Sequence, residues 1–499
     1  MISLVLTFCA LLFLVIYFIG KNNEVYWNKR NVAFYTKNKV TGIMWDFLTK
    51  DTPLFKTVCE VYKEYRNEPA VGIGSFLTPS LYVIDLNNVQ HILASDFHSF
   101  HYRGLDTNKN DLLADNVLFM KGNRWKLMRQ NMTPLFTPTK LKAMFYIVDK
   151  SARDFVIHLE NNPMLLKGNA FNTISSFCSA AISAAVFGVT AKSIFDSPFL
   201  MVAKKSFNST FIKDLKFVIG IFSNGLFKLL GFTMFHDHEK FFINTIKQVL
   251  RERKSSNVKK HDFVDLCVNI QNSGDLLDKE TGYKITPTDE ILAAQAFFFF
   301  VGGVEPTTSA IFTTLVELGK NPKILERLQD EIDETFRKNN NELSYELVMN
   351  MIYLDMVLSE ALRMHPPIAF LMRRCVRDSV LPVGNIKIEN GTKIFIPLYE
   401  RHHDEKHFPE PELFNPERFS PENRHKINDL TYTPFGKGNR QCIGTRFALL
   451  QTKTGLIHLL HNFSVKTLIK DGGIKHRREQ LQVRLDNVDL EFISRAKKI

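Results

Sequence analysis

The feature that most constrains this chain is the loop at residues 434–444, which presents one cysteine shortly before a helix. Gly436 and Gly438 permit backbone turns with positive φ, and an apolar helical pattern begins at Thr445. A helix N-terminus stabilises a thiolate, because its free N–H groups and positive dipole end favour negative charge. Cys442 is therefore a candidate metal ligand or nucleophile. A buried structural cysteine beside a glycine turn is the alternative.

The loop has the pattern Phe-x-x-Gly-x-Arg-x-Cys-x-Gly, from Phe435 to Gly444. In this pattern it resembles the haem-binding loop of the cytochrome P-450 family. The resemblance implies haem (iron protoporphyrin IX) as cofactor, with Cys442 as the axial metal ligand that donates electron density for O–O cleavage. It also implies that Phe435 and Gly436 shield the sulfur, that Gly444 leaves room for the flat macrocycle, and that Arg440 holds a haem propionate.

Further expected propionate donors lie far from this loop in the sequence. Trp125 and Arg129 are four residues apart, which places them on one face of a helix predicted to open at Gly122. The family carries a Trp-x-x-x-Arg helix of this kind, whose two side chains donate to a propionate. Arg373 precedes Asp378 in an Arg-x-x-x-x-Asp pattern. By resemblance, Arg373 is the third donor.

A second set of residues resembles a structural network of the family. Glu360 and Arg363 lie three apart on a predicted helix, and Arg418 follows within Pro-Glu-Arg-Phe. Such a Glu/Arg pair on a surface helix is common and contributes little stability. With Arg418, however, the pair resembles the family's buried Glu-Arg-Arg network. We expect these three residues to hold the thiolate loop, and so to act in folding and haem retention rather than in chemistry.

A long buried helix is predicted from residue 289 to about 319, although it contains two glycines and a proline. Glycine costs roughly 1 kcal/mol and an interior proline about 3 kcal/mol, so these interruptions need a reason. The family has small-Gly-x-acid-Thr here, over the haem on its oxygen side. Gly302, Gly303 and Glu305 match this pattern, whereas Pro306 stands at the position of the threonine.

Proline has no N–H, so the carbonyl of Gly302 loses its helical partner and the oxygen-side groove should persist without a threonine. We hypothesise that a water on this carbonyl, with Glu305 or Thr307 behind it, relays protons to the reacting oxygen. Thr307 lies about 100° further around an ideal helix and can serve only if the kink turns it inward. The candidate catalytic residues are Gly302, Gly303, Glu305 and Thr307. The alternative is a haem-thiolate isomerase or dehydratase, which needs no oxygen activation.

The N-terminal residues 2–19 carry no charge and are long enough to cross a bilayer. Lys21, Lys29 and Arg30 follow, and no small-x-small cleavage site is present, which favours an anchor over a cleaved signal peptide. We expect an anchor over residues 1–20, a linker over 21–44 and a haem-thiolate catalytic domain over 45–499. The resemblance implies the endoplasmic reticulum membrane, with this domain on the cytoplasmic face.

Composition limits the partners. The net charge of +12 fits an acidic protein or anionic lipid as partner. Nucleic acid is not indicated, because the sequence has no run of basic residues interleaved with aromatic ones. Six cysteines without a C-x-x-C pair give no disulfide framework or zinc site, which fits a reducing compartment. Basic residues around the loop could form a docking face for an acidic reductase, namely Lys126, Lys437, Arg446 and Lys453. Residues 204–235 have the composition of a membrane-lying lid or of ordinary core helices.

The resemblance extends over the whole chain and is strongest to the microsomal branch in insects. It implies a mainly α fold with a small β region, in which haem lies between the long helix and the Cys442 loop. The implied reaction inserts one oxygen atom from O₂ into a lipophilic small molecule such as a xenobiotic, hormone or lipid. Electrons come from NADPH through a flavoprotein reductase, with cytochrome b5 as an optional second donor. A catalytically silent haem or ligand binder is a further alternative, which the intact Cys442 argues against.

Overall fold

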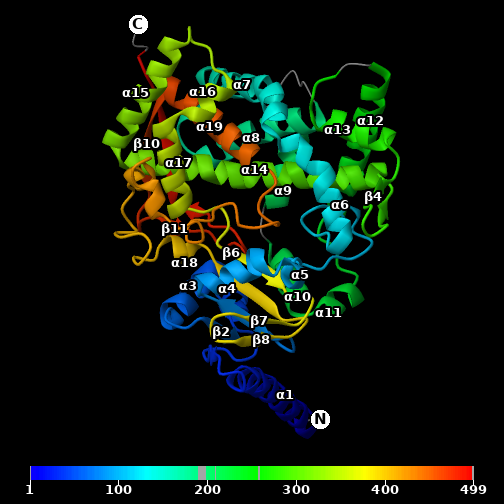
Figure 1. The fold of residues 1–499 in the computed structure, drawn as a ribbon. Helices are drawn as coiled ribbons and strands as arrows, with labels where there is room; N and C mark the ends of the chain where they lie inside the picture. Colours follow the sequence, from blue (N-terminus) through cyan, green and yellow to red (C-terminus); the bar gives the residue numbers. More distant parts are fainter. Residues whose placement is uncertain (1, 189–197, 208–209, 257–258, 497–499) are drawn as a thin grey trace.

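The computed structural model describes residues 2–188, 198–207, 210–256 and 259–496. A helical body forms one part of the molecule, a smaller region with the main β-sheet lies below it, and helix α1 extends from the bottom (Figure 1). The predicted fold class, mainly α with a small β region, is therefore confirmed. The described helices are α1 Ile2–Asn28, α2 Met44–Thr49, α3 Leu54–Tyr65, α4 Leu86–Gln90, α5 Phe97–Phe100, α6 Gly122–Met132, α7 Pro138–Asn161, α8 Ala170–Phe187, α9 Pro198–Phe207, α10 Phe211–Phe222, α11 Asn224–Leu229, α12 His236–Ser256, α13 Phe263–Asn272, α14 Asp289–Lys320, α15 Pro322–Lys338, α16 Tyr345–Asn350, α17 Ile352–Met364, α18 Tyr399–His402 and α19 Thr445–Asn462.

The largest sheet has five strands in the order β1-β2-β3-β9-β6. β2 and β3 are antiparallel, β3 and β9 are parallel, and β9 and β6 are antiparallel, so the sheet joins N-terminal strands to strands from residues 370–397. The other described strands form two-stranded pairs. The bounds are β1 Ala33–Phe34, β2 Ala70–Ile73, β3 Ser80–Val83, β4 Leu276–Leu277, β5 Lys284–Ile285, β6 Phe370–Arg374, β7 Ser379–Leu381, β8 Ile386–Ile388, β9 Lys393–Pro397, β10 Phe463–Ile469, β11 Lys475–His476, β12 Leu485–Asp486 and β13 Val488–Ser494.

Apolar runs alternate with turns over residues 69–96, which predicts short strands, and this prediction is only half right. The apolar runs at 70–73 and 80–83 are β2 and β3, but residues 86–95 are helical. Asp85 caps this helix, because its side chain accepts hydrogen bonds from the backbone N–H groups of Asn87 and Asn88. The cap, rather than the apolar pattern, decides the local structure.

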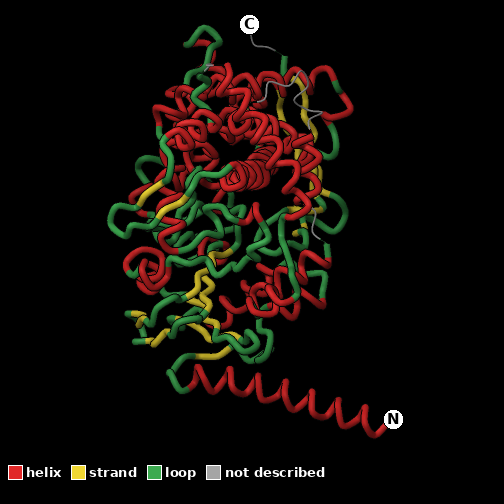
Figure 2. The backbone as a smooth tube through the Cα atoms, turned by 90° about the vertical axis from the view of Figure 1, so that its right-hand side faces the viewer, coloured by secondary structure: helices red, strands yellow, loops and turns green. Residues whose placement is uncertain are grey.

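Helix α14 forms the centre of the helical body. It crosses the middle of Figure 1 and is seen end-on in Figure 2, surrounded by other helices. The helix continues through Pro306 without a break. Gly303 has a packing reason, since a Cβ there would lie 3.0 Å from the side chain of Ile182 on α8. The glycine thus allows α8 and α14 to approach closely.

The anchor prediction agrees with the first helix. Among the described residues three helices are long and apolar enough to cross a membrane, but two of them, Ala170–Phe187 and Asp289–Lys320, are mostly buried within the protein. The third, Ser3–Asn28, has an apolar stretch that is almost wholly exposed, and it is the candidate span.

The stretch predicted as a linker, residues 21–44, is partly folded. Helix α1 continues to Asn28, and β1 pairs with β2. Trp27 is fully buried, and a Cβ on Gly72 would lie only 2.3 Å from its indole. This stretch is therefore packed against the body and is not a free hinge. The domain boundary at residue 45 stays a prediction.

Candidate active site

The loop before α19 holds Cys442 by hydrogen bonds of its own backbone. The N–H of Cys442 donates to the carbonyl of Phe435 at 2.9 Å, and the N–H of Gln441 donates to that of Gly438 at 2.9 Å. Gly438 has a φ of 73°, and a Cβ there would lie 1.9 Å from the carbonyl oxygen of Leu93. Only glycine fits at that position. The loop is therefore a preformed mount that leaves Cys442 open to a cavity, while protein atoms surround its thiol.

The expected lowering of the Cys442 pKa by the helix N-terminus is outweighed. Burial raises the pKa of the Cys442 thiol, and this effect exceeds the opposing ones. The N–H of Gly444, the hydroxyl of Thr445 and the charges of Arg103 and Arg129 each favour the thiolate. A coordinated metal cation deprotonates a thiol outright, so this surrounding is compatible with a metal ligand.

Four arginines gather behind this loop, and three of them, Arg129, Arg373 and Arg440, are predicted propionate donors. Burial and the charges of its neighbours lower the pKa of Arg440 to about 8 and that of Arg373 to about 9. Burial likewise lowers the pKa of the fourth, Arg103, to about 10 and also lowers that of Arg129. Within the described parts of the chain, no carboxylate raises the pKa of Arg103, Arg129 or Arg373.

The arginine cluster fits haem by its chemistry. Uncompensated charges away from water are costly, so the cluster calls for a group that brings negative charge. Haem supplies two propionates, and Arg103 has a buried Nε atom without a hydrogen-bond partner in the described structure. Arg103 and Arg129 also donate to the carbonyls of Arg440 and Gln441, at 2.8 and 3.0 Å. The cluster is thus tied to the loop that carries Cys442.

Arg440 also makes several contacts within the protein. Its guanidinium donates to the carbonyls of His101, Val117 and Met120 at 2.7–3.1 Å and lies 4.1 Å from the ring of Trp125. These contacts place Trp125 and Arg440 together as predicted from the two motifs. The propionate role of Arg440 stays a prediction, because much of its donor capacity is used on backbone.

Arg103 is the site residue that the sequence reasoning missed. It follows helix α5 and precedes Gly104, which has a φ of 83°. A lone Arg-Gly pair is a weak signal, since many surface turns contain one. Only the tertiary contact with the Arg440 carbonyl assigns it to the site.

One cavity joins the thiolate loop to the oxygen-side helix. Its polar or backbone lining comes from Cys442, Gly444, Gly302, Gly303 and Thr307. Thr307 therefore lies at the cavity, although helix α14 is continuous through Pro306. The remaining lining is apolar and comprises Leu135, Phe136, Met144, Ile182, Ala185, Val186, Phe298, Phe299, Ile443, Phe447 and Ala448.

Glu305 does not line this cavity. Its carboxylate is buried and lies 3.7 Å from the guanidinium of Arg484, on another side of α14. Burial raises the pKa of Glu305 to about 8, with Arg484 acting in the opposite direction. Of the four candidate catalytic residues, three meet at the cavity and Glu305 stands apart. Its part in the proton relay stays a prediction.

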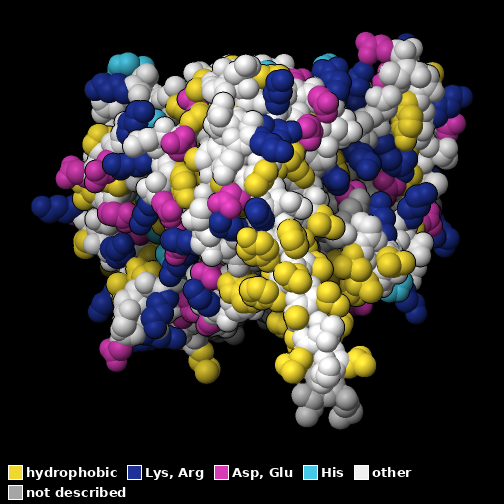
Figure 3. Space-filling view, turned by 90° about the horizontal axis from the view of Figure 1, so that it is seen from below, with side chains coloured by type: hydrophobic (Ala, Val, Ile, Leu, Met, Phe, Trp, Pro, Cys, Tyr) yellow, Lys and Arg dark blue, Asp and Glu magenta, His cyan; other side chains and the backbone are white. Residues whose placement is uncertain are grey.

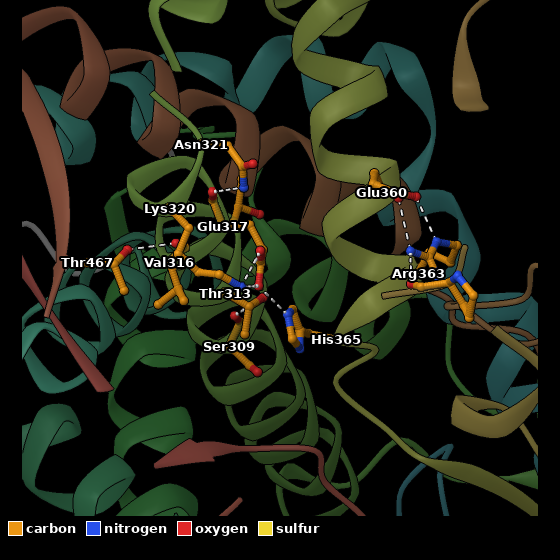
Figure 4. A network of polar contacts seen from close by, with 12 residues as sticks. Ser309, Thr313, Val316, Glu317, Lys320, Asn321, Glu360, Arg363, His365 and Thr467 are labelled. Atoms are coloured by element: carbon orange, nitrogen blue, oxygen red, sulfur yellow. Dashed lines mark hydrogen bonds and ion pairs between the residues drawn. The ribbon is translucent and has the colours of Figure 1, made fainter. Parts of the chain in front are cut away.

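The Glu-Arg-Arg residues are in contact with one another. Arg363 Nε and Nη2 donate to the two oxygens of Glu360 at 2.7 and 3.0 Å, and Arg418 Nε donates to Glu360 at 3.2 Å. Figure 4 shows the first pair beside a second link, in which His365 Nε2 lies 2.9 Å from Glu317 Oε1 on α14. Helix α17 is thereby joined both to the segment that carries Arg418 and to α14.

The expected basic docking face is largely neutralised. Lys453 is buried and binds Asp355 at 2.8 Å, so it cannot face a partner. Lys126 is held by Glu280 at 2.7 Å, and Lys437 lies 3.5 Å from Asp429. Helix packing buries Lys453, which charge counting along the sequence does not reveal.

Comparisons with known proteins agree with this geometry. The family model for "Cytochrome P450" matches residues 38–487. Probable cytochrome P450 6a13 of Drosophila melanogaster is 33% identical over 454 residues, which cover 88% of each chain. Cytochrome P450 9e2 of Blattella germanica is 31% identical over 486 residues, covering 92% of this chain and 91% of the relative. Cytochrome P450 6B2 of Helicoverpa armigera is 30% identical over 464 residues, covering 92% and 91%.

These relatives are insect proteins, as the sequence resemblance predicted, and they span nearly the whole chain. Their family accounts for the cysteine loop, the arginine cluster and the helix over the cavity. These comparisons do not favour the isomerase or dehydratase alternative. The chain belongs to the cytochrome P450 family of haem-thiolate monooxygenases.

Proposed function

We propose that this cytochrome P450 inserts one oxygen atom from O₂ into a lipophilic small molecule that it takes from a membrane. The observation that carries this proposal is the apolar surface around the anchor. Seen from below, hydrophobic side chains gather about the base of α1 (Figure 3). Exposed apolar residues on α2, α10, α11 and the loop after β2 are Trp45, Phe76, Leu77, Phe211, Ile212, Leu226, Leu229 and Leu230.

These elements are in contact with one another. The rings of Phe76 and Phe222 are 5.4 Å apart, and Asn23 of α1 donates to the carbonyl of Phe76 at 3.0 Å. Helix α10 buries Phe217, Val218 and Ile221 in the smaller hydrophobic core beside the sheet. The predicted lid over residues 204–235, of which 208–209 lie outside the described residues, thus contains both lid-like and core-like faces. We propose that its exposed face enters the lipid.

The site residues then have distinct roles. Cys442 ligates the haem iron, Arg103, Arg129, Arg373, Arg440 and Trp125 hold the propionates, and Phe435 and Gly436 shield the sulfur. When bound, haem supplies the activation of O₂. The Thr307 hydroxyl and the Gly302 carbonyl hold a water that delivers protons at the cavity. The apolar walls exclude bulk water and orient a lipophilic substrate.

The electron source and location form part of the same proposal. We propose NADPH as the electron source, through a flavoprotein reductase, with cytochrome b5 as an optional second donor. The net charge of +12 supports an acidic partner or anionic membrane surface. The exposed apolar helix supports an anchor in the endoplasmic reticulum membrane, with the catalytic body on the cytoplasmic face.

The test uses the haem-loaded full chain in phospholipid vesicles with an NADPH-dependent flavoprotein reductase. A panel of fatty acids, steroids and terpenes is incubated under ¹⁸O₂ in ordinary water, and the products are analysed by mass spectrometry. We expect hydroxylated products that contain one ¹⁸O atom and form only with NADPH. Conversion without NADPH, or oxygen taken only from water, would contradict the proposal and favour an isomerase or dehydratase.

A further inference from the structure

The connection between β11 and β12, residues 477–484, is here named the polar strap. Six of its eight residues are polar or charged. Glu479 is only 5% exposed and the other five are partly buried, so the strap is a partly buried polar segment. Its backbone is fixed at the end toward β6. The N–H of Ala369 donates to the carbonyl of Leu481 at 2.9 Å, and that of Val483 donates to the carbonyl of Pro367 at 3.3 Å. The strap side chains extend from this support in two directions.

In one direction the strap binds helix α10. Asp214 of α10 is fully buried and accepts hydrogen bonds from Arg478 and, at 3.0 Å, from Gln480. Arg478 is itself held from α2, because its Nη2 donates to the carbonyl of Phe47 at 2.7 Å and its guanidinium lies 4.4 Å from the Phe47 ring. Charge-assisted hydrogen bonds away from water are strong, so Asp214 and Arg478 form a latch between α10 and the strap.

In the other direction the strap reaches Glu305. Arg484 Nη1 lies 3.7 Å from Glu305 and 3.9 Å from Glu479, so one guanidinium serves two carboxylates. Both carboxylate oxygens of Glu305 are buried without a hydrogen-bond partner in the described structure. Arg484 also lies 3.9 Å from the ring of Phe171, which fixes its plane. From the strap, Arg484 and the side chain of Gln482 therefore act on the buried Glu305.

We propose that the polar strap couples the closure of α10 to the placement of the Glu305 carboxylate, with Arg484 as a positioning residue. This inference rests on the proposed function, in which the exposed face of α10 enters the lipid, and on the predicted part of Glu305 in the proton relay. While the Asp214–Arg478 latch is closed, Glu479 stays beside Arg484, and Glu305 is held in place. When α10 moves to admit a substrate, Arg478 moves with Asp214. The distance between the neighbouring Glu479 and the Arg484 guanidinium then changes.

The first arm of the test measures the latch without turnover. Hydrogen–deuterium exchange is followed on the haem-loaded full chain in vesicles, for peptides covering residues 211–222. We expect Asp214→Asn and Arg478→Gln each to raise exchange there about tenfold, because the closed state loses a charged hydrogen bond. Lys475→Gln, which removes an exposed charge next to the strap, should leave exchange unchanged. Unchanged exchange in both latch variants would overturn the latch.

The second arm measures the coupling. Hydrogen peroxide released per NADPH is compared for the same variants and for Arg484→Gln and Arg484→Lys. We expect peroxide to rise several-fold in Arg484→Gln without faster exchange in α10, and to recover in Arg484→Lys, which retains the charge. It should also rise in Asp214→Asn and Arg478→Gln.

Latch variants with fast exchange but normal peroxide would overturn the coupling. Normal peroxide in Arg484→Gln would overturn the positioning role. If the wild type showed no NADPH-dependent turnover while the exchange results held, the proposed function would fail and the latch would stand.

Discussion

The guanidinium of Arg103 donates to the backbone carbonyl of Arg440, with 2.8 Å between Nη2 and the oxygen. This contact brings a cation from the turn after α5 onto the loop that carries Cys442. Arg103 thereby supports the loop from behind and adds to the positive charge of the arginine cluster, which fits the two haem propionates. Its buried, unpartnered Nε is the donor that a propionate would satisfy.

Replacing Arg103 should weaken haem retention. We expect Arg103→Leu to reduce haem affinity about tenfold or more, because a hydrogen bond to a charged group contributes about 1.5–3 kcal/mol. The measurement is the transfer of haem to apomyoglobin, timed by absorbance. Arg377→Leu, which removes an exposed arginine, is the control. Equal haem loss from the two variants would remove Arg103 from the site.

The buried Glu360 carboxylate should be critical for stability. Glu360→Gln leaves the buried guanidinium of Arg363 without its partner and should lower the free energy of unfolding by about 3–5 kcal/mol. The measurement is chemical unfolding in detergent, followed by circular dichroism. Glu334→Gln breaks an exposed helical pair with Lys338 and should change little. A small effect of Glu360→Gln would contradict the structural role of the network.

Gly438 tests the preformed mount of the thiolate. Gly438→Ala forces a Cβ into the Leu93 carbonyl, whereas Gly282 also has positive φ but nothing within 4 Å of its added Cβ. Both substitutions carry the backbone strain of about 1–2 kcal/mol, so their difference isolates the clash. We expect Gly438→Ala to abolish haem binding in the expressed protein and Gly282→Ala to retain it. Similar haem content in both variants would show that the loop can move.

The geometry that was predicted correctly depends on local spacing. Cys442 sits in a ten-residue pattern, Glu360 and Arg363 share one helix turn, and α14 has a long apolar period even with Pro306 inside it. In each case the residues of the pattern are close together both in the sequence and in the structure. Local geometry then determines the outcome.

The failures depend on contacts between distant segments. Arg103 meets Arg440 across more than 300 residues, and Lys453 is buried by helices that no local pattern identifies. The pairing of Arg484 with Glu305 likewise joins a C-terminal loop to the central helix. The expected lowering of the Cys442 pKa was wrong for a related reason, because burial of the thiol outweighs the effect of the local helix end.

The raised pKa of Glu305 makes stability depend on pH. Because the folded pKa, about 8, exceeds the ordinary value of 4.5, the folded state holds the proton more tightly. The contribution of Glu305 is complete below pH 4.5 and is lost as pH rises toward 8, by an amount on the order of 3–5 kcal/mol. Thermal unfolding from pH 5 to 9 should therefore show a steeper fall for wild type than for Glu305→Gln. Parallel curves would mean that Glu305 is ionised throughout.

Thr307 should limit the release of hydrogen peroxide per NADPH. Thr307→Ala removes the hydroxyl that lines it, so proton delivery should fail more often and peroxide per NADPH should rise several-fold. Thr308 is the matched control, because its hydroxyl donates to the Val304 carbonyl at 2.8 Å and does not line the cavity. Combining Thr307→Ala with Glu305→Gln should raise peroxide per NADPH further. Normal coupling in the double variant would reject the proton relay.

The most direct test of the account is the carbon monoxide difference spectrum of the reduced, haem-loaded protein. Thiolate ligation by Cys442 predicts the long-wavelength absorption band typical of this family in the wild type and its loss in Cys442→Ser. A wild type that binds no porphyrin, or a Cys442→Ser variant with an unchanged spectrum, would contradict the account.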